Sequence, residues 1–179
     1  MPKYVAFLRA VNVGGHVVKM DELRELFSSL KFSNVETFIA SGNVIFDTKS
    51  APDRKLEEKI EKRLETALGY EVGTFVRSLD EIRAVTTHQA FASDAVKSAY
   101  VVNVGFMRDS LSASVIEQAM SFRTDIDDFH IHGREVYWLC RIRQSDSKFP
   151  AKKFEKAITG PATWRNRNTV VRLADKYSH

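Results

Sequence analysis

The order of apolar runs and amphipathic stretches constrains the fold of this chain most. In its first half, four short apolar runs typical of buried strands alternate with two segments whose apolar residues recur at helical spacing. These elements occupy residues 3–9, 20–30, 35–40, 44–47, 56–68 and 71–76. The order is β-α-β-β-α-β, which is the ferredoxin-like arrangement, or α/β plait, around an antiparallel sheet.

The second half of the chain has a similar order of elements. Strands are predicted at 99–106, 129–132 and 135–141, and a lysine-rich helix follows at 152–158. We interpret the similarity as an ancient duplication, although two small α+β domains can share such patterns by chance. The expected fold is α+β, with tandem ferredoxin-like units. The expected domains are a first unit at 1–78, a helix and linker at 79–97, and a second unit with a C-terminal helix at 98–179.

Short polar motifs predict where the elements turn and begin. Ser41-Gly42-Asn43 is typical of a hairpin turn, because glycine and asparagine tolerate positive φ angles. Ser50 is a candidate cap for the following helix. Ser78 with Glu81, and Ser114 with Glu117, have the spacing of capping boxes.

The positive charge of the chain is concentrated near its C-terminal end. The net charge is +4, but residues 141–179 carry 10 Lys and Arg against 3 Asp and Glu. Such a segment indicates an anionic partner, such as nucleic acid, a nucleotide or a phosphorylated metabolite. A solvated surface is the alternative interpretation.

Several features favour a cytoplasmic protein. Cys140 is the single cysteine and has no internal disulfide partner; we expect it to be buried as a small hydrophobic residue. The apolar run at the start is broken at Arg9 and lacks a signal-peptide pattern. No stretch approaches the ~18–20 apolar residues that span a bilayer, so no membrane association is expected.

The segment Asn12-Val13-Gly14-Gly15 lies between the first strand and the first helix. Glycines allow a ligand to approach the backbone, and N–H groups near a helix start attract anions. Lys19 would add positive charge. A plain connecting turn is the alternative, because the segment matches no phosphate-binding motif.

A second candidate binding segment precedes the last predicted helix. Trp164, Arg165, Asn166 and Arg167 stand together there. Arginine can hold a phosphate or carboxylate in a fork, and tryptophan can stack on a base. Alternatively, an asparagine or threonine of this segment caps the last helix.

No motif identifies a metal, a cofactor or a catalytic residue. His130 and His132 alternate with Phe129 and Ile131 and therefore face the same side of a strand. A metal site needs further ligands, which the sequence does not supply nearby, so we expect neither a metal nor a cofactor. Catalysis stays open, because active sites are assembled in space.

Several motifs resemble the family known as domain of unknown function 1697. They are Arg9-Ala-Val-Asn12-Val-Gly14-Gly15, Met20-x-x-Leu23-Arg24, Thr37-Phe-Ile-Ala-Ser41-Gly42-Asn43-Val44-Ile-Phe46 and Arg165-Asn166-x-x-Thr169. The resemblance covers nearly the whole chain and implies two ferredoxin-like units in tandem, but no activity. Ala10 stands where the family typically has glycine, and Arg167 where it typically has tryptophan.

These observations lead to one hypothesis and two alternatives. We expect the protein to bind a small anionic or phosphate-bearing ligand in a cleft between the two units. The candidate ligand-binding residues are Arg9, Asn12, Gly14, Gly15, Lys19, Ser41, Asn43, Arg165, Asn166 and Arg167. The alternatives are a nucleic-acid-binding protein, although no strand has the aromatic pattern of an RNA-recognition motif, and an enzyme whose active site lies between the units. The sequence leaves the oligomeric state open.

Overall fold

The computed structural model of this chain describes residues 1–12 and 14–178, without the side chain of Ser41. Val13, part of the predicted turn, lies outside these residues. The structure divides into two units: residues 1–84 together with those from Leu173 onward, and residues 85–172. The expected domains are 1–78, 79–97 and 98–179. In the structure, residues 79–84 and the residues from Leu173 onward belong to the first unit, and residues 85–97 belong to the second.

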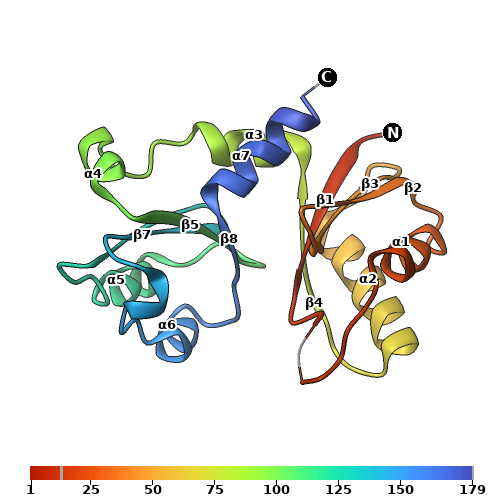
Figure 1. Cartoon of the computed structure of the whole chain (residues 1–179), viewed down its shortest axis with the longest axis horizontal. Coiled ribbons are helices and arrows are strands. Elements are labelled where there is room, and N and C mark those ends of the chain that lie inside the picture. The colour runs from red at the N-terminus through yellow and green to blue at the C-terminus, as the bar shows by residue number, and fades with distance from the viewer. Residues whose placement is uncertain (13, 179) are drawn as a thin grey trace. The chain divides into compact units, whose positions relative to one another are not determined.

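The first unit is a four-stranded antiparallel sheet with two helices on one face (Figure 1). Its elements are β1 (Lys3–Arg9), α1 (Met20–Ser28), β2 (Ser33–Phe38), β3 (Ala40–Asp47), α2 (Asp53–Leu68) and β4 (Gly73–Ser78). The strand order is β2-β3-β1-β4. Phe27, Phe46 and Ile60 are completely buried between the sheet and the helices.

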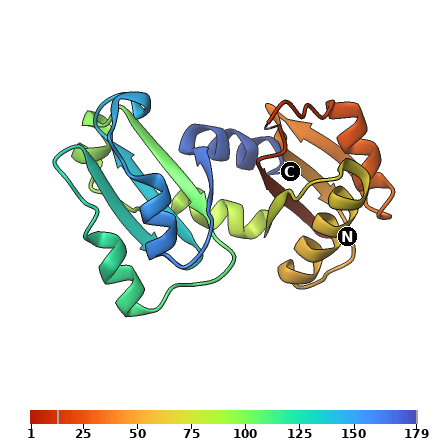
Figure 2. The ribbon, with the colours of Figure 1, turned by 90° about the horizontal axis from the view of Figure 1, so that it is seen from below.

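The second unit repeats the β-α-β-β-α-β order, with additional helices, and its strand order β6-β7-β5-β8 corresponds to that of the first unit. Its elements are α4 (Ser93–Ser98), β5 (Val101–Phe106), α5 (Ala113–Met120), β6 (Asp127–His132), β7 (Glu135–Cys140), the 3-10 helix η1 (Gln144–Asp146), α6 (Ala151–Ala157), β8 (Thr163–Asn166) and the start of α7 (Arg167–Lys176), whose residues from Leu173 onward belong to the first unit. Figure 2 shows these strands and helices from a second direction. The predicted α+β fold, with two ferredoxin-like units in tandem, is confirmed.

The core of the second unit lies between its sheet and helices α5 and α6. Phe129, Trp138 and Phe154 pack there, and the indole Nε1 of Trp138 donates a 2.8 Å hydrogen bond to the buried carboxylate of Asp127. Cys140 is buried in the same cluster, as expected, and burial raises the pKa of its thiol.

The C-terminal residues are fixed to the first unit by Tyr177. Its hydroxyl donates a 2.6 Å hydrogen bond to the Glu36 carboxylate, and its carbonyl accepts one of 3.3 Å from Arg83. Its ring packs edge-on against Phe38 of β2. Helix α3 (Leu79–Thr87), which carries Arg83, begins with the predicted capping box: the Ser78 amide donates to Glu81, and the Glu81 amide to Ser78.

Three local predictions were wrong. Ser41-Gly42-Asn43 does not form the hairpin turn but lies within β3, where Asn43 pairs with Phe7 of β1. The chain reverses at Ile39, whose φ is 65°. Ser50 does not cap α2, which follows Pro52 and has no side-chain cap. Helix α5 is capped by Ser112 in place of Ser114, because the Ser112 hydroxyl accepts from the Val115 amide.

None of the helices in the described residues is both long enough and apolar enough to span a membrane.

Candidate functional site

One face of the sheet in the second unit carries polar side chains, whereas the other packs on α5 and α6. Because neighbouring residues of a strand alternate between the faces, residues paired across strands form rows. One such row consists of His130, Tyr137, Val104 and Arg165. His132 and Glu135 form a neighbouring pair on the same face. The predicted common orientation of His130 and His132 agrees with this register.

The segment after α3 brings a third histidine onto this face. His88 Nε2 lies 2.9 Å from His130 Nε2, and the His88 ring stacks on that of His132 with centroids 4.0 Å apart. The Tyr137 ring is also adjacent, 5.5 Å away between centroids. Sequence reasoning missed His88, because it lies outside any strand or amphipathic pattern that could indicate its neighbours.

His88, His130 and His132 form the histidine cluster, in which the environment of His88 and His130 favours the neutral imidazole. Burial lowers the pKa of both His88 and His130, and the neighbouring imidazoles lower it further. The contact between two Nε2 atoms agrees with this, because at least one nitrogen must accept the hydrogen bond. Among the described residues, no group of three or more His, Cys, Asp or Glu side chains is arranged to hold a metal ion.

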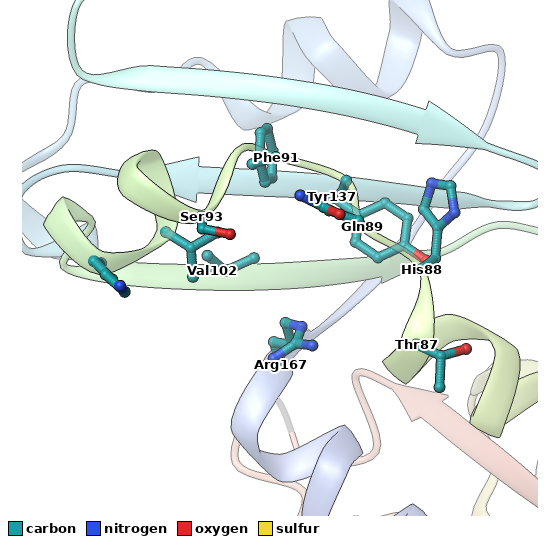
Figure 3. A pocket seen from close by; sticks show the side chains of 11 residues that line it. Thr87, His88, Gln89, Phe91, Ser93, Val102, Tyr137 and Arg167 are labelled. Carbon is teal, nitrogen blue, oxygen red and sulfur yellow. The ribbon is translucent and has the colours of Figure 1, made fainter.

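A pocket of about 310 Å³ opens beside His88 and Tyr137 (Figure 3). Phe91 and Val102 contribute apolar walls, whereas Lys97 and Arg167 contribute positive charge. Gln89, Ser93 and His88 add groups that form hydrogen bonds. No carboxylate lines this pocket in the part of the chain that the structure describes. The pocket therefore combines apolar surface, polar groups and unbalanced positive charge.

The two cations of the pocket are held differently. Arg167 is the first residue of α7, and its Nη2 donates a 2.9 Å hydrogen bond to the Thr86 carbonyl. This bond fixes the guanidinium at the wall of the pocket. Lys97 is exposed on α4 and has no acidic partner among the described residues. Lys97 can therefore reorient toward a ligand, while Arg167 is preorganised.

The other candidate residues of the second unit serve its structure. Burial lowers the pKa of the Arg165 guanidinium to about 10, so it still carries its charge at neutral pH. Its Nη1 donates to the Thr163 hydroxyl at 2.9 Å and to the Trp164 carbonyl at 2.8 Å. The Asn166 side chain accepts a 2.9 Å hydrogen bond from the Asn168 amide, so it has the predicted capping role at the start of α7.

The polar candidates of the first unit also form bonds to the backbone. The Asn12 side chain accepts from the Val18 amide at 2.8 Å, and Asn43 donates to the Phe38 carbonyl at 3.1 Å. Asn12 thus stabilises the loop before α1, and Asn43 the β2–β3 hairpin.

The remaining candidates of this unit lie at the ends of its elements. Gly14 and Gly15 have φ angles of 59° and 83°, which agrees with the predicted turn. Arg9 is half-buried at the end of β1, and Lys19 is exposed immediately before α1. The side chain of Ser41 lies outside the described residues. The cleft predicted between the two units stays a prediction.

Comparison with known proteins identifies a family of unknown function and a solved structure of similar fold. The family model "Protein of unknown function (DUF1697)" matches residues 1–137. A solved structure of a conserved bacterial protein from Streptococcus pneumoniae is similar, with a TM-score of 0.78 and 22% sequence identity, over 100% of this chain and 99% of that one. That similarity supports the fold. No curated protein matches this sequence.

Proposed function

We propose that this chain, which belongs to the DUF1697 family of proteins of unknown function, binds a small anionic ligand in the pocket of its second unit. The observation that carries the proposal is the composition of that pocket. Arg167 and Lys97 both line a cavity of about 310 Å³ without a carboxylate among its described lining residues. Such unbalanced charge favours a ligand of opposite sign.

The walls of the pocket favour a ligand with an apolar part. Phe91 and Val102 offer apolar surface, and the Tyr137 ring offers an aromatic one. The volume lies at the lower end of the range for small-molecule sites, roughly 300–1,000 Å³. The proposed ligand is therefore a small carboxylate or phosphate compound with an apolar or aromatic body, whose anionic group binds Arg167 and Lys97.

A thermal-shift screen of the whole chain tests this function. The screen compares aromatic carboxylates, nucleotides and sugar phosphates, because each has an anionic group on a compact body. A bound ligand at a hundredfold excess over its Kd stabilises the native state by about 2.7 kcal/mol. If no compound of these classes raises the melting temperature, the proposal is wrong.

The residues of the pocket are then tested with the best compound. Lys97→Ala removes one charge, whereas Arg167→Lys keeps the charge and loses the planar fork. We expect both variants to lose most of the ligand-induced shift. Arg172→Ala is the control, because Arg172 is exposed on the same helix α7 and does not line the pocket. An equal loss in this control would indicate a general effect of charge.

The nucleic-acid-binding and enzyme alternatives stay predictions.

A further inference from the structure

The first unit contains a separate cavity of about 400 Å³ whose lining is rich in lysine. Its walls come from four places in the chain: Met1, the turn after α1, the β3–α2 connection, and the first turns of α2. The charged members of this lysine cavity are Lys31, Lys49, Lys55 and Lys59. Lys55 and Lys59 lie on α2, whereas Lys31 and Lys49 come from other segments, so the tertiary fold brings the four together.

Three of the four lysines lack a compensating charge. Lys31, Lys49 and Lys55 are exposed and form no ion pair among the described residues. Lys59 is held in place, because its Nζ donates a 3.1 Å hydrogen bond to the Leu30 carbonyl and lies 5.1 Å from the centre of the Phe32 ring. Like charges around one cavity repel one another, and a bound anion would relieve that repulsion.

Two carboxylates of β3 and α2 have partners other than these lysines. Asp47, at the end of β3, pairs with Lys3 at 2.8 Å and accepts a hydrogen bond from Asn34. Glu58 of α2 pairs with Arg54 at 3.3 Å. Within the described residues, no Asp or Glu lines the cavity.

The lining of the lysine cavity differs from that of the pocket in the second unit. Leu30, Ala51 and Leu56 contribute apolar lining, and the lysines add flexible point charges. The cavity has no arginine in its described lining to grip a single planar anion in a fork. Several mobile ammonium groups suit a compact ligand whose negative charge is spread over linked groups. Helix α2 also begins here, without a side-chain cap and with Asp53 in its first turn.

We propose that the lysine cavity is a second ligand site, which binds a small molecule carrying two or more linked phosphate groups. This site is independent of the pocket around Arg167, since it lies in the other unit and shares no residue with it.

Calorimetric titration of the whole chain with tripolyphosphate, pyrophosphate and orthophosphate tests this site. We expect affinity to rise with the number of linked phosphates, because each added charge can meet another lysine. The triple variant Lys31→Ala, Lys49→Ala, Lys55→Ala should weaken tripolyphosphate binding by about tenfold or more, that is, by about 1.4 kcal/mol. The failure of wild-type protein to bind tripolyphosphate at millimolar concentration would overturn the proposal.

Two controls separate the site from general electrostatics. The triple variant Lys148→Ala, Lys152→Ala, Lys153→Ala removes the same charge from exposed positions of the second unit and should leave tripolyphosphate binding unchanged. Circular dichroism checks that both variants remain folded. An equal loss of affinity in the two variants would overturn the proposal.

A short single-stranded oligonucleotide tests the other source of linked phosphates. We expect it to bind more weakly than tripolyphosphate, because the cavity accommodates a compact anion better than an extended chain. Tighter oligonucleotide binding that the cavity variant abolishes would assign the site to a nucleic-acid backbone and overturn the small-ligand proposal. Arg167→Lys should leave tripolyphosphate affinity unchanged, so failure of the Arg167 pocket and failure of this cavity are distinguishable.

Discussion

On one face of the second sheet, His88 from the segment after α3 meets His130 and His132 of β6. Alternation along one strand places His130 and His132 on the same face, and the register confirms it. His88 reaches the same face from a segment distant in sequence, and nothing local encodes that contact. The roles of Asn12 and Asn43 could not be predicted either. Polar residues beside glycines indicate a ligand or a turn, and only the fold shows the backbone groups to which these two side chains bind. Sequence thus identifies suitable chemistry at these positions but does not identify its partners.

The histidine cluster predicts how stability depends on pH. In the folded chain, burial and neighbouring imidazoles lower the pKa of His88 and His130 below the value of about 6.5 expected when unfolded. Below that pH, the unfolded chain binds more protons than the folded chain, so the free energy of unfolding falls as the pH falls. The stabilisation of the folded chain that results from these two lowered pKa values is complete above about pH 6.5 and is lost progressively below it.

Melting temperatures between about pH 5 and pH 8 measure this effect. His130→Gln keeps a group that can hydrogen-bond near Nε2 but cannot titrate, so we expect a shallower decline toward acid pH. His16→Gln is the control, because His16 is exposed and lies in the first unit, outside the cluster. A decline of unchanged steepness in His130→Gln would contradict the role of the cluster.

At the scale of elements, the periodicity of apolar residues predicted where strands and helices lie better than it predicted where each one begins and ends. The Ser78–Glu81 capping box was correct, but the sequence around α5 offers serines at 110, 112 and 114, and the structure uses Ser112. Ser41-Gly42-Asn43 has the composition of a turn, yet pairing with β1 keeps it extended. The reversal at Ile39 was not foreseeable, because a β-branched residue rarely adopts a φ of 65°.

The central strand of the second sheet predicts a sensitive glycine. In Gly105→Ala, the new Cβ would lie 2.7 Å from Val136 Cγ1 on β7 and 3.0 Å from Trp164 Cζ3 on β8. Both neighbours belong to packed strands, so we expect a loss of about 1–3 kcal/mol in the free energy of unfolding. Gly160→Ala is the matched control, since its Cβ would have no heavy atom within 4 Å. Equal urea midpoints for the two variants would refute the close packing at Gly105.

At the scale of the whole molecule, the sequence predicted the architecture well. Both halves repeat one order of strands and helices, and the two sheets have corresponding topologies, β2-β3-β1-β4 and β6-β7-β5-β8. This order could be predicted because the periodicity of apolar residues is a local property of the sequence. The two cavities could not be predicted in this way, because their linings combine segments that only tertiary packing brings together. Neither the Arg167 pocket nor the lysine cavity was therefore predicted as such.

The distribution of charge over the whole chain leaves nucleic acid as the rival partner, and salt dependence discriminates between the two classes. Residues 141–179 carry 10 Lys and Arg against 3 Asp and Glu, enough to contact several phosphates of a nucleic acid. Each neutralised phosphate releases counterions, so a protein with six such contacts loses about a thousandfold in affinity between roughly 50 and 200 mM salt. A small anion held by a few directed hydrogen bonds in the Arg167 pocket should lose much less affinity over the same range of salt.

We therefore expect the ligand found by the thermal-shift screen to bind with a shallow salt dependence. We expect a labelled oligonucleotide, followed by fluorescence anisotropy, to bind only weakly at about 150 mM salt, with a Kd above roughly 1 μM. Tight oligonucleotide binding with a steep salt dependence would instead identify the basic C-terminal segment as a nucleic-acid interface.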